Sequence, residues 1–163
     1  KTTQVLDADS LRGFQQQADA VYVDPAVIEY AVALAKATRD TASVGRPELA
    51  RWLTFGASPR ASINLVLAAR ALAFLRGRDH VLPTDVRDLS RDVLRHRIVL
   101  SYEALAENLS PDDVLGPIIE AVPVPQVPLR ERPVAVPPSP TASGGRDHWG
   151  DAVPGSAWAR PRD

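Results

Sequence analysis

Apolar residues recur at helical spacing through the first three-quarters of the chain, and helix start and stop signals separate these stretches. Asp7 is placed to cap a first helix that ends near Ala18. Asp24 followed by Pro25 is a start signal for a second helix, which ends near Arg39. The apolar stripe of the second helix has spacings of 4, 3 and 4 residues: Val27, Ala31, Leu34 and Thr38.

Residues 59–76 form the most apolar of these stretches. Ser58 and Pro59 repeat the pairing of a capping residue with proline at the first helical position. The helix that follows is apolar on nearly all sides, so we expect it to be buried on most sides and to lie at the centre of a bundle. Gly77 suits the left-handed residue that ends many helices.

Three further helices are expected after that stop. One begins at Pro83, with a possible break near Ser90. A short one covers residues 101–108, and Ser110 caps a last helix that ends near Val122. Leu82 stands before Pro83, where a capping residue is usual, so the cap of this helix is either weak or supplied by Thr84. Together these helices predict an all-α fold, a small helical bundle.

The connector, residues 40–56, contains one helical turn at residues 47–53. Two aromatic residues, Trp52 and Phe55, lie in this connector. Large aromatic side chains bury much apolar surface, so we expect both to anchor the connector to the core.

Proline marks a change in composition near residue 122. Six of the fifteen prolines lie in residues 1–122 and nine in residues 123–163. The later stretch has no period of 2 or 3.6, which predicts a disordered Pro-rich tail after a folded domain of residues 1–122. Trp149 and Trp158 are unusual in such a tail and could anchor a partner. Residues 125–130 match a polyproline ligand pattern, P-x-x-P-x-R, that often arises by chance.

Composition excludes several kinds of chemistry. The chain of 163 residues has no Cys and three scattered His, which argues against a metal site or a thiol nucleophile. Its net charge is −1, no apolar run is long enough to span a bilayer, and no secretory signal opens it. We therefore expect a cytoplasmic protein with no nucleic-acid partner and no membrane span. Met is absent even at position 1, which suggests a chain cut from a longer protein.

Arg60 is out of place by the usual rules of helix electrostatics. If Ser58 is the cap, Arg60 is the second helical residue, where a cation opposes the helix dipole by about 0.3–1 kcal/mol. An anion beside this turn would accept hydrogen bonds from the free amides and pair with the guanidinium, and phosphate is well suited to both. The alternative is that Arg60 points to solvent or pairs with a nearby acid.

Other charged groups favour structural roles. Arg70, inside the apolar helix, is expected to pair with an acid of a neighbouring helix. Residues 95–97 are basic and fit a helix end, and His80 is expected at or near the surface. Interleaved charges after Pro83 predict an exposed face with salt bridges: Asp85, Arg87, Asp88, Arg91, Asp92 and Arg95.

The stretch LTFGASPRASINLVLAARALAFLRGRDHV, residues 53–81, resembles the C-terminal lid domain of MoxR-family AAA+ ATPases. The similarity extends forward through residues 83–86 and 93–97 and backward through residues 24–39, so that it covers about residues 5–122. GASPRA followed by an AARALA helix and GRD is a specific combination.

The resemblance implies a helical lid packed against an AAA+ core that precedes it in the same chain. Arg60 corresponds to the sensor-2 arginine, which reaches from the lid to the nucleotide phosphates, and Ser58 and Pro59 would fix the helix start that aims it. ATP and Mg²⁺ would be the cofactors of the parent protein. Its partners would be neighbouring subunits of a chaperone-type ring and a client protein that the sequence does not identify.

The nucleotide-binding parts themselves are missing from this sequence. It contains neither a G-x-x-x-x-G-K-[ST] loop nor an apolar strand ending in Asp-Glu, so we expect this fragment alone not to hydrolyse ATP or bind it tightly. The alternative reading is a non-enzymatic interaction module with the tail as a docking arm. A DNA-binding helix-turn-helix fits less well, because residues 1–122 carry 14 basic and 16 acidic side chains and lack a basic stripe.

Overall fold

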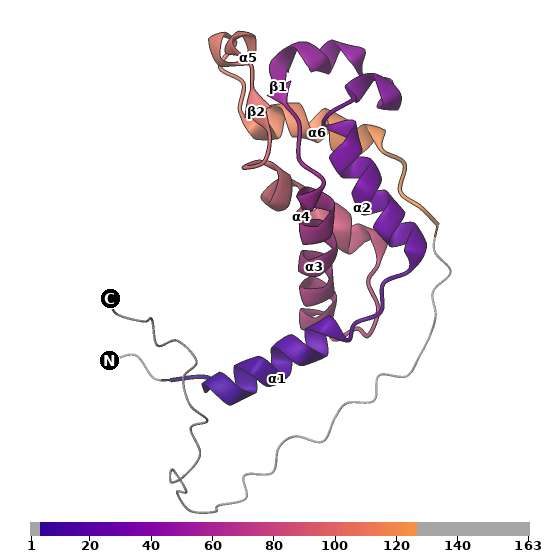
Figure 1. Cartoon of the computed structure of the whole chain (residues 1–163), viewed down its shortest axis with the longest axis vertical. Helices are drawn as coiled ribbons and strands as arrows, with labels where there is room; N and C mark the ends of the chain where they lie inside the picture. The colour runs from indigo at the N-terminus through magenta and orange to yellow at the C-terminus, as the bar shows by residue number, and fades with distance from the viewer. Residues whose placement is uncertain (1–3, 127–163) are drawn as a thin grey trace, which may run out of the picture.

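The structure, a computed structural model, describes residues 4–126 (Figure 1). These residues form an elongated helical bundle with a small two-stranded sheet, which confirms the predicted all-α class in its main part. The elements in chain order are α1 (Ala8–Asp19), α2 (Pro25–Ala37), η1 (Thr41–Val44), η2 (Pro47–Trp52), β1 (Leu53–Phe55), α3 (Arg60–Leu75), α4 (Pro83–Leu94), β2 (Val99–Leu100), α5 (Tyr102–Ala106) and α6 (Pro111–Ala121). The predicted tail, with Trp149, Trp158 and the polyproline pattern, lies almost wholly outside the described residues.

Most helix starts are those that the capping signals predict. The Asp7 carboxylate accepts a hydrogen bond from the Ser10 N–H at 2.7 Å, and the Asp24 carboxylate accepts one from the Ala26 N–H at 2.9 Å. Ser101 caps α5 in the same way, and Ser110 caps α6 through a reciprocal pair of bonds with Asp113. Gly77 has a φ of 70°, the left-handed conformation expected after α3.

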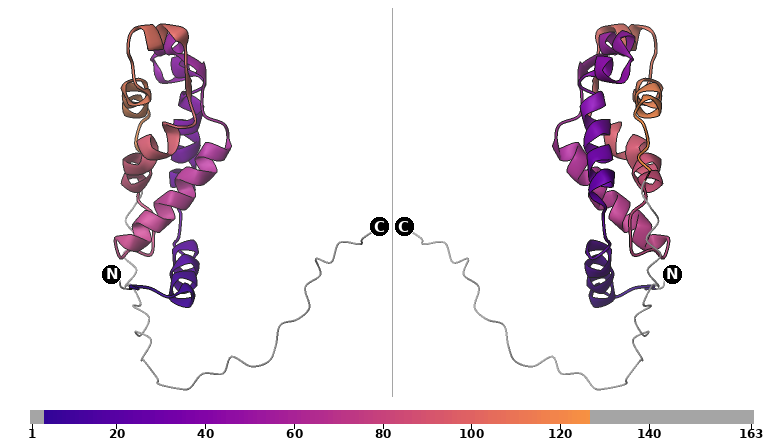
Figure 2. Two further views of the ribbon diagram at one scale, coloured as in Figure 1. Left: turned by 90° about the vertical axis from the view of Figure 1, so that its left-hand side faces the viewer. Right: turned by 90° about the vertical axis from the view of Figure 1, so that its right-hand side faces the viewer.

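The core lies where α2, α3, α4 and α6 meet. The largest fully buried apolar side chains come from these four helices: Leu34, Leu65, Leu94, Leu115 and Ile118. In contrast, α1 has no buried residue and lies at the end of the molecule opposite α5 (Figure 2). It contacts α3 through a tilted ring pair between Phe14 and Phe74, whose centroids are 6.0 Å apart. Among the helices within residues 4–126, none combines the length and apolar character needed to cross a membrane.

The connector differs from the prediction at its end. Its helical turn is present as η2, but residues 53–55 then form β1, which pairs antiparallel with β2 through Leu53 with Leu100 and Phe55 with Val99. Phe55 is 67% exposed, so its predicted role as a core anchor is wrong: the strand turns its side chain outward. Trp52 does pack against the core, with the Arg51 guanidinium 5.0 Å from its ring centroid.

Two expectations about α3 are wrong. The helix begins at Arg60, with Pro59 as its N-cap in a helical conformation and no side chain capping it, so Ser58 does not cap and Arg60 is the first helical residue. Pro59 has helical φ and ψ angles but lies before the first residue of α3, so the helix begins one residue later than predicted. The helix is also buried on one side only, because its buried residues lie on a single stripe: Ala61, Leu65, Ala69 and Ala73.

The helix α4 is continuous, so the break considered near Ser90 is absent. The Ser90 hydroxyl donates to the Arg87 carbonyl at 2.6 Å, a bond that keeps the side chain within the helix. Neither Leu82 nor Thr84 caps α4 with its side chain. Instead, the Asp85 carboxylate accepts a hydrogen bond from the Leu82 N–H at 2.8 Å, so an acid inside the first turn holds the helix start.

Candidate functional site

Arg60 projects from the start of α3 into solvent. Its side chain is exposed, and the structure gives it no hydrogen bond or ion pair with any of residues 4–126. Of the two alternatives to an anion site, the structure agrees with Arg60 pointing to solvent and gives no support to its pairing with an acid among residues 4–126. The guanidinium lies beside a helix start that no side chain caps, a place where an anion would be stabilised by both.

The position of this helix start is fixed by a buried contact with the end of α2. The Ala57 N–H donates to the Thr38 hydroxyl oxygen at 2.8 Å, and that hydroxyl donates to the Ala35 carbonyl at 2.8 Å. Thr38 and Ala57 are both buried. A Cβ on Gly56 would lie 2.3 Å from the Thr38 carbonyl oxygen, so only glycine allows the two segments to approach this closely. Thr38 is thus a positioning residue for the Arg60 turn that sequence reasoning missed.

Thr38→Val should lower the free energy of unfolding by about 1–3 kcal/mol, because the buried Ala57 N–H loses its acceptor while the side-chain shape is kept. Thr41→Val is a matched control. Thr41 is also buried, but its hydroxyl has no hydrogen-bond partner, so its removal should be neutral or stabilising. Urea denaturation of the two variants measures the difference. Equal stabilities would show that the Thr38 bond does not hold the turn.

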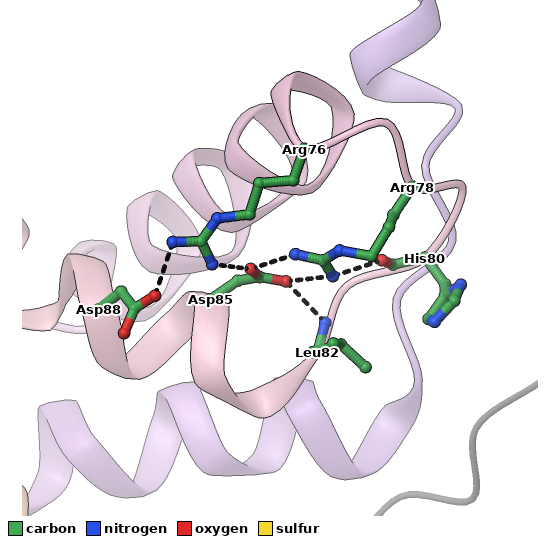
Figure 3. A network of polar contacts seen from close by, with 6 residues as sticks. All are labelled: Arg76, Arg78, His80, Leu82, Asp85 and Asp88. Carbon is green, nitrogen blue, oxygen red and sulfur yellow. Dashed lines mark hydrogen bonds and ion pairs between the residues drawn. The ribbon is translucent and has the colours of Figure 1, made fainter.

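A network of charged side chains around one buried carboxylate joins the end of α3 to the start of α4 (Figure 3). The Asp85 carboxylate is fully buried and accepts hydrogen bonds from Arg76 at 2.7 Å and from Arg78 at 2.8 Å. Arg76 also donates to Asp88 at 2.8 Å. The charge pattern predicts Asp85 on an exposed face with the arginines of its own helix, and this is wrong. The left-handed turn at Gly77 instead brings Arg76 and Arg78, which flank that glycine, to Asp85.

The surroundings of Asp85 change its acidity in two opposing ways. Burial raises the pKa of a carboxyl group, but the hydrogen bonds from Arg78, Leu82 and Arg76 and the charge of Arg78 outweigh it. The pKa of Asp85 therefore lies below its ordinary value, and the group is ionised at neutral pH. Because Asp85 on α4 binds Arg76 and Arg78 at the end of α3, the network stabilises the packing of the two helices.

The other charged residues singled out in the sequence confirm some predictions and contradict one, the ion pair of Arg70. Arg95 pairs with Asp92 at 2.9 Å at the end of α4, as predicted. His80 is half-buried, with its Nδ1 atom 2.8 Å from an Asp79 carboxylate oxygen. Arg70 forms no ion pair with another described residue, and its buried Nε atom has no hydrogen-bond partner, because no acid of α2 or α4 reaches it. Within residues 4–126, no group of three or more His, Asp or Glu is placed to hold a metal ion.

Comparison with known proteins defines the class of this domain. The family model of the AAA lid domain matches residues 50–118, which run from η2 through most of α6. The fold is also similar to the crystal structure of a Cytophaga hutchinsonii protein that is described provisionally as an ATPase. The TM-score is 0.66 at 37% identity, and the match covers 68% of this chain and 34% of that one. The helical domain is an AAA lid domain.

The related sequences specify the kind of lid. The chain is 44% identical over 124 residues to the Chaperone MoxR1 of Mycobacterium tuberculosis, a match that covers 76% of this chain and 33% of the relative. It is 41% identical over 110 residues to Protein MoxR of Paracoccus denitrificans, covering 64% and 32%. The chain thus spans about a third of the length of these relatives. Together the comparisons fit a lid fragment of a MoxR-family AAA+ ATPase, which confirms the resemblance drawn from GASPRA and the helix after it.

Proposed function

We propose that this lid contributes Arg60 to an ATP site, as a sensor-2 arginine, in a MoxR-like AAA+ ATPase. The observation that carries the proposal is the exposed Arg60, which has no partner among residues 4–126, at an uncapped helix start that a buried contact holds in place. A guanidinium offers paired donors that match phosphate oxygens. In this arrangement Ser58 and Pro59 lead the chain into α3 and so determine the direction of Arg60.

ATP and Mg²⁺ would be bound mainly by an AAA+ core, because the described residues offer neither a phosphate loop nor a cluster of carboxylates. ATP supplies the phosphoryl group to be transferred, and Mg²⁺ neutralises charge that develops on it. The part of this chain is to bind phosphate oxygens through Arg60 and to move as a unit with the nucleotide state. The partners would be the core, neighbouring subunits of a ring and a client protein, as the relative called a chaperone suggests.

The proposal is tested in the full-length protein that contains this lid. Arg60→Ala should reduce the rate of ATP hydrolysis about 100-fold, the effect expected for loss of a preorganised charged donor to the transition state. Arg60→Lys should recover only part of the rate, because ammonium cannot make the bidentate contact. Steady-state phosphate release measures all rates.

Arg46→Ala serves as the matched control, since Arg46 is an exposed arginine whose pairing with Glu48 at 3.6 Å is a surface contact. We expect it to keep the ATPase rate within about twofold, as a surface pair contributes little. Thermal melting of Arg60→Ala should equal that of the parent. An unchanged ATPase rate in Arg60→Ala would contradict the sensor role, and a large drop in melting temperature would make Arg60 a structural residue.

A further inference from the structure

An apolar groove runs between α2 and α3 on the side of α3 that is not buried. It encloses about 360 Å³ and is lined by residues of both helices: Ile28, Val32, Ser62, Ile63, Val66, Leu67 and Arg70. Four of its apolar side chains are exposed, with Ile63 at 59%. This groove is the reason that the prediction of an α3 buried on most sides is wrong: the apolar residues are present, but none of residues 4–126 covers those that are exposed here.

One basic group lines an end of the groove, and two more lie beyond its other end. Arg70 lines one end, and its buried Nε atom lacks a hydrogen-bond partner among the described residues. Arg60 is not a lining residue but lies just beyond the other end, two residues before Ser62, about 20° from Leu67 around the helix axis and about 15 Å along the axis from Arg70. Lys36 follows Val32 by one turn of α2 and lies near the start of α3, because α2 ends beside residue 57. An occupant should therefore be apolar at its centre and acidic at both ends.

We propose that residues 147–151 of this same chain occupy the groove. The segment reads Asp-His-Trp-Gly-Asp, with Trp149 at its centre. In an extended chain alternate residues share a face, so Asp147, Trp149 and Asp151 would all face the groove. The two aspartates would then be about 13 Å apart, close to the spacing of the basic groups. A tryptophan buries 150–250 Å² on docking, which suits an apolar cleft of this size.

The connection is long enough for this segment to reach the groove. The described chain ends at Gln126, after α6, and 23 residues separate it from Trp149 (149 minus 126). An unfolded chain of that length spans roughly 25 Å on average and about 75 Å when fully extended. The extended span is about three times the length of α3, which is about 24 Å long (16 residues at about 1.5 Å each), so the connection can reach the groove from Gln126. The acidic segment would cover the same helix face that bears Arg60.

Trp158 provides a control within the chain. Its neighbours two residues away are Ser156 and Arg160, so it lacks the flanking acids. In a nitrogen-15-labelled sample of the 163-residue chain, each of the three tryptophans gives one indole N–H resonance, which Trp→Phe variants assign. We expect the Trp149 resonance to be shifted from its position in a free peptide of residues 144–154, and the Trp158 resonance to remain at the free-peptide position.

Ile63→Asp should return the Trp149 resonance to the free-peptide position, because it puts a charge in the groove. Leu75→Asp is the matched control: Leu75 is 80% exposed on the same helix but outside the groove, and should leave the shift in place. The half-buried Trp52 reports that the fold is kept. A Trp149 resonance at the free-peptide position in the parent chain would overturn the proposal, and so would a shift that survives Ile63→Asp. A shift that disappears on dilution would also overturn it, because it would indicate docking on a second copy of the chain. None of these readouts involves nucleotide, so they are independent of the ATPase test.

Discussion

Asp85→Asn should lower the free energy of unfolding of this domain by about 3 kcal/mol, the lower end of the cost of breaking a buried ion pair. Asp85 is fully buried and accepts hydrogen bonds from two arginines and a backbone N–H (Figure 3). Asn keeps the shape but presents an N–H₂ group to donors that need an acceptor. The lower end applies because Arg76 and Arg78 are partly exposed and can recover some hydration. Urea denaturation measures the change.

Asp88→Asn is the matched control for this prediction. Asp88 also pairs with Arg76, at 2.8 Å, but its side chain is 50% exposed. An ion pair open to solvent contributes about 0–1 kcal/mol, so this variant should unfold close to the parent. If both variants lost the same stability, the exposed ion pair between Arg76 and Asp88, and not the buried carboxylate of Asp85, would hold α3 to α4.

The acid stability of the domain should follow from the same group. The pKa of Asp85 is lowered in the folded state, and its unfolded value is about 3.9. The stabilisation by the carboxylate is therefore fully present above pH 3.9 or so and is lost as the pH falls through the lower folded pKa. Denaturation midpoints of the parent should fall on acidification in this range more steeply than those of Asp85→Asn.

The helix starts could be predicted from the sequence because the groups that decide them lie within four residues of each other. The carboxylates of Asp7 and Asp24 and the hydroxyl of Ser110 each meet an amide two or three residues away. Gly77 likewise ends α3 through its own φ. Such signals act before any tertiary contact forms, so one sequence suffices to find them.

The residues whose surroundings the sequence predicts wrongly are those that depend on contacts between distant parts of the chain. Phe55 is exposed because β1 pairs with β2, which lies more than 40 residues later, and both strands are too short to show a period. Charge patterning within α4 could not show that Asp85 turns toward arginines from the end of α3. The candidate site follows the same division. GASPR marks Arg60 by its local pattern, whereas the role of Thr38 depends on a hydrogen bond across 19 residues.

Gly56→Ala should destabilise the domain by about 2–3 kcal/mol, within the range for inserting a methyl group into a packed site. The added Cβ would lie 2.3 Å from the carbonyl oxygen and 2.6 Å from the carbonyl carbon of Thr38. Both are backbone atoms at the end of α2, so neither can move aside as a flexible side chain would. Relief requires the loop before α3 to shift, which would weaken the hydrogen bond from Ala57 to Thr38.

Gly13→Ala provides the control with the opposite sign. Gly13 lies inside α1, and a Cβ there meets nothing within 4 Å, so alanine should raise stability by about 0.5–1 kcal/mol through its better helix propensity. Thermal melting should move down for Gly56→Ala and up for Gly13→Ala. If Gly56→Ala melted like the parent, the close approach of α2 to the start of α3 would not be needed. The direction of Arg60 would then have to be fixed by α3 alone, without the anchor at the end of α2.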